Sequence, residues 1–280
     1  LLLGSWLVGS AVTALQYWEF SVRRTEGEVL VERGLFERST RTVPYRRVQA
    51  VRQKEGLLRQ MMGRVTVAID VAGIGVTGEG GSPTDESGPT VLHPLVRAAD
   101  APSFTGMMVP GHEPPELVRL PRAALSRYVF RAVAVPAIVA AVLTYLVPFG
   151  WIGVVLPVVA GVWGVWAYRD ARWGLGSEVL ALRWRDVGRT TVLVRRRRIQ
   201  SVAVSQHPLQ KGAGLASLSV HVAASPSNAT FEMVHLPEED AMRILAWVSG
   251  RGPGGAGDVS GHAPPALADP PPDVWHATFE

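Results

Sequence analysis

Cysteine is absent from this 280-residue chain, and lysine is nearly so, with Lys54 and Lys211 as its two examples. The missing thiols exclude disulfide bonds, cysteine nucleophiles and cysteine-ligated zinc. Charged residues make up 19% of the chain, and arginine carries almost all of the positive charge. The net charge of +4 favours an anionic neighbour, for which a membrane surface and a nucleic acid are the alternatives.

Charge is also missing from one long stretch. Between Arg131 and Arg169 the chain holds no charged residue, and this length suits two helical spans of about 18–20 residues each. Proline and glycine in "VPFG" at 147–150 predict a tight turn between them. The pattern therefore predicts a transmembrane helical hairpin at 128–168, whereas a buried hairpin of a soluble core would normally carry a polar face. The expected helices cover 129–147 and 151–168.

Arginine placement predicts how this hairpin is oriented. Arginines precede and follow the apolar stretch, and the turn at 147–150 carries none. Since positively charged flanks stay in the cytoplasm, both polar segments are expected there, with the turn outside. Residues 1–15 are apolar and are expected to be the truncated end of another helix of a multi-pass protein. The flanking arginines are Arg119, Arg122, Arg127 and Arg131 before the hairpin, and Arg169 and Arg172 after it.

One unusual phrase occurs twice, as "VPYRRVQAV" at 43–51 and "VRRRRIQSV" at 194–202. Flanking blocks match at a shift of 150 residues on one side and 151 on the other, so one inserted residue is expected between them. Alternating apolar residues predict strands in both copies, with Val48 and Ile199 buried and Gln49 and Gln200 equivalent. The repeat therefore predicts two β-rich modules, at 16–110 and 169–250, joined by a juxtamembrane segment at 111–127 and the hairpin.

Each module is expected to hold five or more antiparallel strands followed by a helix. In the second module the acidic residues after Pro237 and the apolar face beyond them predict that helix, with Gly250 as its stop. In the first module the corresponding segment lacks clean periodicity. Residues 73–89 are expected to form a flexible loop, and the Pro/Gly-rich residues 251–280 a disordered tail. The expected second-module strands cover 178–184, 189–194, 199–206, 215–224 and 230–236.

The two copies beside a membrane hairpin resemble the bacterial PH-domain family of membrane proteins. The resemblance is carried by "LVERGLFERSTRTVPYRRVQAV" at 30–51 and "GLLRQMMGRVTVAIDVAG" at 56–73, and more loosely by 195–224. The second copy departs from the pattern where Trp184 replaces Gly34 and where His207-Pro208 replaces the glycine-leucine pair at 56–57. It implies an α+β protein of the bacterial cell membrane. Its two PH-like antiparallel β-barrel modules would each end in a capping helix and be separated by the hairpin. The resemblance implies no established activity.

Six arginines in the repeated phrase are the candidate contacts to lipid or a partner: Arg46, Arg47, Arg195, Arg196, Arg197 and Arg198. Their planar donors suit phosphate, and each could contribute about 1 kcal/mol at an anionic leaflet. The alternative is that they are solvated or ion-paired structural residues. Four consecutive arginines in a strand would put two on each face.

Three classes of function remain open. The favoured one is a non-catalytic membrane-anchored scaffold whose partners are membrane lipids and a protein partner or second copy. A nucleic-acid binder is disfavoured because few aromatic residues interleave with the arginines for base stacking. A transporter or membrane enzyme would need polar groups in the spans, where 132–168 offers Thr144 and Tyr145 besides tryptophan indoles. Histidine spacing predicts no metal site, and no phosphate-binding or nucleophile motif predicts a cofactor or an enzyme.

Overall fold

The computed structural model describes residues 21–33, 39–72, 89–223 and 229–250. The expected N-terminal span at 1–15, nearly all of the expected loop at 73–89 and the expected tail at 251–280 lie outside these residues. The strands are β1 (Ser21–Thr25), β2 (Glu28–Arg33), β3 (Ser39–Pro44), β4 (Val48–Glu55), β5 (Arg64–Val71), β6 (Thr90–Arg97), β7 (Val118–Arg119), β8 (Arg172–Leu175), β9 (Val179–Arg185), β10 (Arg189–Arg195), β11 (Ile199–Ser205), β12 (Leu215–Val222) and β13 (Ala229–Pro237). The α-helices are α2 (Leu57–Met61), α3 (Ala101–Met108), α4 (Arg122–Leu146), α5 (Val155–Asp170), α6 (Pro208–Lys211) and α7 (Glu238–Ser249), and the 3₁₀ turns are η1 (Tyr45–Arg47), η2 (Gly150–Val154) and η3 (Arg196–Arg198).

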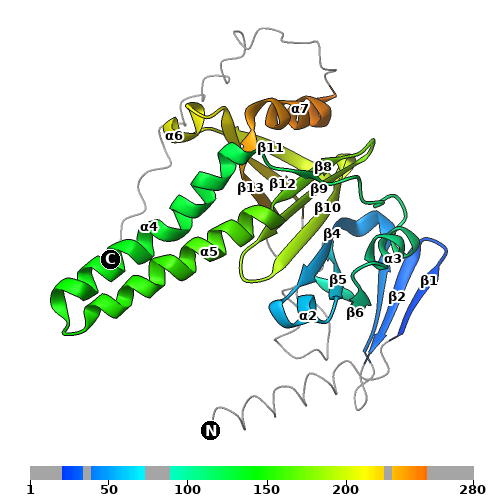
Figure 1. Ribbon diagram of the computed structural model, residues 1–280. Helices are drawn as coiled ribbons and strands as arrows, with labels where there is room; N and C mark the ends of the chain where they lie inside the picture. Colours follow the sequence, from blue (N-terminus) through cyan, green and yellow to red (C-terminus); the bar gives the residue numbers. More distant parts are fainter. Residues whose placement is uncertain (1–20, 34–38, 73–88, 224–228, 251–280) are drawn as a thin grey trace, which may run out of the picture.

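The strands form three antiparallel sheets (Figure 1). Two three-stranded sheets, β1-β2-β3 and β11-β12-β13, belong to the first and second module respectively. The third sheet has seven strands in the order β6-β5-β4-β10-β9-β8-β7, so it runs from one module into the other. The described residues therefore contain open sheets and no closed barrel, and the expected barrel form of the modules is not confirmed.

The junction between the modules is the pairing of β4 with β10, in which Val51 lies opposite Leu193. Strands β9 and β10 bury side chains on both faces. Leu180 and Leu182 pack into the core of the second module, while Ala181 and Leu193 pack into that of the first. Because each hydrophobic core contains residues from the other module, the two modules form one folding unit rather than two independent domains.

Strand pairing relates β1–β5 to β8–β12 by a constant offset of 151 residues. Val29 pairs with Val43 in the first copy, and Leu180 pairs with Val194 in the second. The same offset relates Gly63 to Gly214, which both adopt a φ of 61° in the turn after the short helices α2 and α6. The expected inserted residue is therefore wrong, because the equivalent side chains of these five strands in each module keep one spacing.

Most expected elements are present, with differences at their ends. The second-module strands and α7 match the expectation to within two residues, and Gly250 ends α7 in the left-handed conformation, with φ 73°. The first module ends in α3, a helix whose pattern is obscured by Pro102 and Gly106. The expected juxtamembrane segment at 111–127 supplies strand β7 and the first residues of α4.

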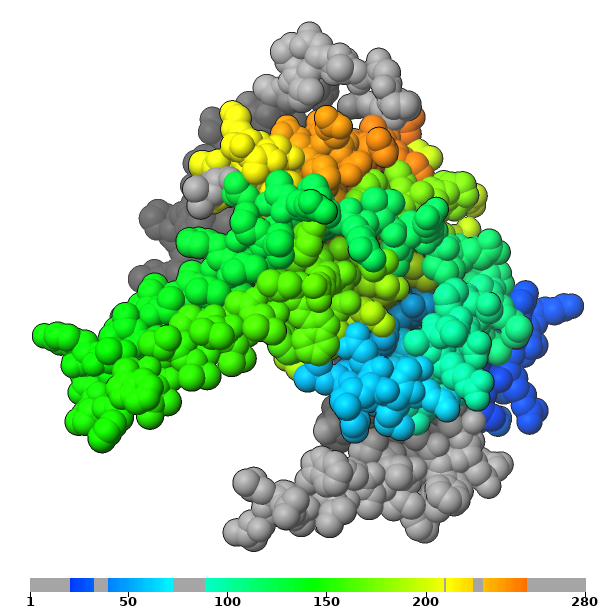
Figure 2. All heavy atoms as spheres, viewed as in Figure 1, coloured from blue at the N-terminus to red at the C-terminus, as the bar shows by residue number. Residues whose placement is uncertain are grey.

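Helices α4 and α5 form the expected hairpin, whose turn end projects away from the sheets (Figure 2). Both are long and apolar enough to cross a membrane, and few of their side chains are buried. They approach closely at Gly164, where a Cβ atom would lie 3.0 Å from the carbonyl oxygen of Tyr128 and the Cα of Val129. The second helix begins four residues later than expected, because the 3₁₀ turn η2 precedes it.

Candidate functional site

A buried ion-pair network fixes the hairpin to the sheets. Asp170, at the end of α5, accepts a hydrogen bond of 2.5 Å from Nε of Arg185, whose side chain is fully buried. The same guanidinium donates to Gln60 of α2 and lies 4.0 Å from the ring centre of Trp166. Arg189 binds Glu55 across the β4–β10 junction at 2.5 Å. Hairpin and both modules therefore meet at one set of mutually satisfied charges.

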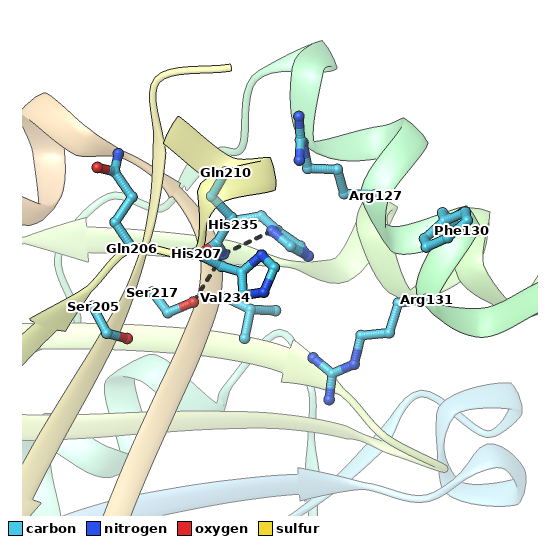
Figure 3. Close-up of a pocket in the computed structure, with 10 residues that line it drawn as sticks. All are labelled: Arg127, Phe130, Arg131, Ser205, Gln206, His207, Gln210, Ser217, Val234 and His235. Carbon is cyan, nitrogen blue, oxygen red and sulfur yellow. Dashed lines mark hydrogen bonds between the residues drawn. The ribbon is translucent and has the colours of Figure 1, made fainter. Parts of the chain in front are cut away.

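A cavity of about 480 Å³ lies beside this base, where α4 passes the end of β13 and helix α6 (Figure 3). Its volume falls in the range of small-ligand sites. Two arginines of α4, four residues apart on one helix face, line one side of it. Polar side chains from β11, α6, β12 and β13 line the other. The lining residues are Arg127, Phe130, Arg131, Ser205, Gln206, His207, Gln210, Ser217, Val234 and His235.

His235 enters this cavity because strand β13 contains a bulge. Leu218 pairs with Met233 and Ala216 with Leu236, so Val234 and His235 together face the single residue Ser217. His235 has a φ of 61°, a left-handed conformation that is uncommon for a residue other than glycine. A bulge of this kind redirects a side chain out of the regular strand pattern.

Hydrogen bonds fix the tautomer of His235. The backbone N–H of His207 donates to Oε1 of Gln210, which leaves the Gln210 Nε2 group as the donor on the other side. Nε2 of Gln210 lies 3.0 Å from Oγ of Ser217 and 3.1 Å from Nδ1 of His235. Nδ1 of His235 therefore accepts, and the proton of the neutral ring lies on Nε2.

The cavity is electropositive. Burial, followed by the positive charges of Arg127 and Arg131, lowers the pKa of His235 to about 4. The ring is therefore neutral at pH 7. Tyr128, between the two arginines in sequence, donates to the carbonyl oxygen of Val234 and stacks edge-on against the His235 ring. These contacts tie α4 to the bulge, so helix and strand position the basic groups together.

The six arginines singled out from the sequence lie elsewhere. Arg46 and Arg47 are exposed in the 3₁₀ turn η1, and Arg196, Arg197 and Arg198 form the equivalent turn η3. The four consecutive arginines do not share a strand, since Arg195 ends β10 and the other three form η3, so the arrangement with two arginines on each strand face does not arise.

Three of the four second-module arginines contact residues of neighbouring segments. Arg196 lies over the Trp247 ring at 5.6 Å, and Arg197 pairs with Glu178 at 3.6 Å. Arg195 packs against Gly111 in the connection after α3.

The pairing of β4 with β10 brings η1 and η3 to the same end of the sheet. Ala50 lies opposite Val194 at this end, and Glu55 lies opposite Arg189 at the other, beside the base of the hairpin. The turns are thus separated from the hairpin base by the length of the strands, about 20 Å. Of the expected equivalent pairs, Val48 and Gln49 are buried, whereas Ile199 is half-buried and Gln200 exposed.

The cavity was not foreseen from the sequence. Arg127 and Arg131 carried a signal for orientation only, and nothing local marks His235 as a residue at a bulge. The equivalent region of the first module, formed by α2 and β5, is different. There Arg59 donates to Thr66 at 2.6 Å, where the second module has Gln210 and Ser217. A bulge there places Leu95 where the second module has His235.

Comparison with known proteins identifies the group. The model of the bacterial PH domain matches residues 1–106 and 129–252. The chain belongs to the bacterial PH-domain family. It is 33% identical, over 248 residues, to the UPF0699 transmembrane protein YdbT of Bacillus subtilis (strain 168). That match covers 88% of this chain and 49% of the relative, so the chain spans about half the length of this relative.

Proposed function

We propose that this bacterial PH-domain chain is a non-catalytic, membrane-anchored scaffold. In this proposal the α4–α5 hairpin crosses the plasma membrane, and both modules lie in the cytoplasm. The observation that carries the proposal is the joint at Asp170 and Arg185, which holds the tandem modules at the base of an apolar hairpin. Modules attached rigidly to the hairpin in this way would hold their surfaces at a constant distance from the bilayer.

In this proposal the arginine and tryptophan side chains around the hairpin base lie at the depth of the lipid headgroups. Gly164 of α5 packs against Tyr128 and Val129 of α4, which places Arg127 and Arg131 opposite the turns that hold Trp163 and Trp166. Tryptophan and arginine favour this depth. Helix α2, bound to the same network through Gln60, exposes Leu57, Leu58, Met61 and Met62.

The membrane arrangement is testable because the chain has no native cysteine. Trp151→Cys places a thiol in the exposed hairpin turn, and Met242→Cys places one on exposed α7. In intact cells an impermeant maleimide is expected to label Trp151→Cys and to label Met242→Cys only after permeabilisation. The reverse pattern would refute the cytoplasmic placement, and labelling of both sites in intact cells would refute the crossing.

The scaffold surface we propose is the outer edge of β11. In the described part of the chain, β11 pairs with β12 on one side and with no strand on the other. None of its seven residues is charged, and none is fully buried. Natural edge strands usually carry charges or proline that block pairing, so an uncharged edge favours the addition of another strand.

The occupant we assign to this edge is β3 of a second copy. Inside the chain, β10 pairs with β4, and at the offset of 151 residues these strands correspond to β3 and β11. Both β3 and β11 have one edge that pairs with no described strand. Repeating the internal pairing between copies would place Thr42 opposite Val202, as Leu193 lies opposite Val51. The Arg189–Glu55 ion pair has no counterpart there, so the contact between copies is expected to be weaker than the internal one.

Disulfide trapping of the full chain tests this assignment. Purified Thr42→Cys and Val202→Cys chains are mixed under mild oxidation, with Thr42→Cys and Met242→Cys as the matched control pair. A crosslinked dimer is expected from the first mixture alone, and Ala203→Lys in the Val202→Cys chain is expected to reduce its yield. Equal yields from both mixtures, or a chain that stays monomeric, would overturn the assignment to a second copy.

Contact of Arg46, Arg47 and Arg195–Arg198 with a ligand stays a prediction. Their place at the sheet end far from the hairpin base favours a protein partner over lipid in the same membrane.

A further inference from the structure

The cavity beside α4 gathers donors that have no acceptor opposite them. Among the described residues no acceptor reaches Nε of Arg127, which is buried, and Arg131 extends into the same space from the next turn (Figure 3). The cavity lining includes no Asp or Glu. We propose that this cavity binds the phosphate group of an anionic headgroup, with Arg127 and Arg131 as its charged donors.

His235 supplies a third donor of a different kind. Because Gln210 fixes Nδ1 as the acceptor, the Nε2–H of the neutral ring is left to donate to a ligand. A neutral donor beside two guanidinium groups suits a phosphate oxygen, since it binds the anion without adding charge repulsion. Binding of an anion would offset the field of the two arginines, and the pKa of His235 would then rise from about 4.

Backbone strain at His235 also points to a ligand. A left-handed residue other than glycine costs free energy and is found where the surrounding structure holds it for a purpose. Here the bulge that produces this conformation also turns the ring toward the cavity. The equivalent position in the first module holds Leu95, whose side chain cannot donate a hydrogen bond, so the described part of that module lacks this donor.

Two sources could supply the phosphate, an anionic phospholipid or a soluble phosphate monoester. The lipid source rests on the proposed function, which puts Arg127 and Arg131 at headgroup depth. Phe130, exposed at the cavity, provides an apolar surface for the glycerol end of such a lipid. The soluble source shares the phosphate contacts but needs neither Phe130 nor a membrane.

The experiment uses the full chain in detergent. Native mass spectrometry measures binding of phosphatidylglycerol and of phosphatidylcholine, and calorimetry measures binding of glycerol 3-phosphate. Arg127→Gln and Arg131→Gln are each expected to weaken phosphate binding about tenfold or more, as expected for the loss of one charge-assisted hydrogen bond. Arg122→Gln removes the same charge from an exposed position on α4 outside the cavity and is expected to have little effect.

The outcomes separate the sources and the hypotheses. Selective binding of phosphatidylglycerol with this arginine dependence assigns the lipid, and the same dependence for glycerol 3-phosphate assigns a soluble ligand. No binding of any probe, or equal losses from Arg122→Gln and Arg131→Gln, overturns the site. Histidine NMR adds a direct readout, since only a ligand in the cavity raises the pKa of His235. Labelling of Trp151→Cys tests the membrane placement independently of all these results.

Discussion

Strands β4 and β11 occupy the same place in the two modules, yet their surroundings differ. In β4 most residues are buried, whereas in β11 none is. The two strands differ in one neighbour, because β10 pairs with the outer edge of β4 and no described strand pairs with that of β11. A duplicated strand thus becomes interior or edge according to what pairs with it, and the free copy is the one available for association.

The short helices that follow these strands, α2 after β4 and α6 after β11, also differ in what they contact. Helix α2 of the first module presents leucine and methionine to solvent and binds the hairpin network through Gln60. Helix α6 of the second presents Gln210 to a basic cavity beside α4. The two modules therefore share one backbone arrangement. The candidate binding site forms in the second module, where helix α4 of the hairpin passes α6.

The largest expected effect comes from breaking the joint that both modules share. Arg185→Ala leaves Asp170 with Arg189 alone, at 3.5 Å, in a largely buried position. Loss of one partner of a buried pair costs about 3–5 kcal/mol of unfolding free energy. Denaturant unfolding of the full chain in detergent measures it.

The matched control for this joint is Arg243→Ala, which removes an exposed arginine from a pair with Asp240 on α7. That change is expected to cost less than about 1 kcal/mol. Similar losses from both variants would show that the buried network does not hold the modules to the hairpin.

A smaller effect separates the paired strand from the free one. Val51 is fully buried in β4, and its counterpart Val202 in β11 is half-buried. Val51→Ala is expected to cost about 1–3 kcal/mol, and Val202→Ala distinctly less, since little of the cavity cost applies at an open edge. Equal losses in the monomeric chain would mean that a described or neighbouring strand covers β11 after all.

Acid is expected to weaken the fold through two histidines. Burial, together with Arg195, lowers the pKa of His112 to about 4, as burial and the α4 arginines do for His235. Both folded-state pKa values lie below the ordinary value of about 6.5, so the unfolded chain binds protons first. Stability should be complete above pH 6.5 and fall as the pH drops toward 4.

His235→Asn separates the two contributions, because asparagine tolerates the left-handed conformation. The melting temperature of this variant is expected to depend less on pH between 6.5 and 4 than that of the parent chain. An unchanged pH dependence would assign the whole effect to His112 and would remove the evidence that His235 is neutral in the cavity.

Alternating apolar residues predicted β5 and β12 as strands, although the burial of both is nearly continuous rather than alternate. The apolar helical hairpin was equally readable, since an uncharged stretch of this length suits two long apolar helices. Helix α3 was not, because Pro102 and Gly106 interrupt its periodicity and its stability comes from packing on β5. Patterning thus found elements whose burial is regular and missed the one whose burial is not.

The junction and the site depend on contacts between distant segments. The pairing of β4 with β10 had one sequence sign, the run of consecutive apolar residues in β10, which is buried on both faces of that strand. The cavity had none, because it needs a bulge in β13 and two arginines about 100 residues earlier to meet. The repeated arginines drew the sequence interpretation to η1 and η3, where repetition reflects the turn between two sheets.

The smallest expected effect on stability, and the one that tests the depth of α2, comes from its exposed methionine. Met61 is 86% exposed, so Met61→Cys should leave the unfolding free energy within about 0.5 kcal/mol of the parent value. If α2 lies at the interface, its apolar side chains enter the headgroup region as those of an interfacial helix do.

A polarity-sensitive fluorophore on that cysteine should therefore emit at shorter wavelength in lipid nanodiscs than the same dye at Met242→Cys on α7. Emission typical of water at both positions would separate α2 from the membrane surface. The first module would then be linked to the bilayer only through the ion-pair network at the hairpin base. Helix α2 would have no membrane contact of its own to compare with the cavity beside α6.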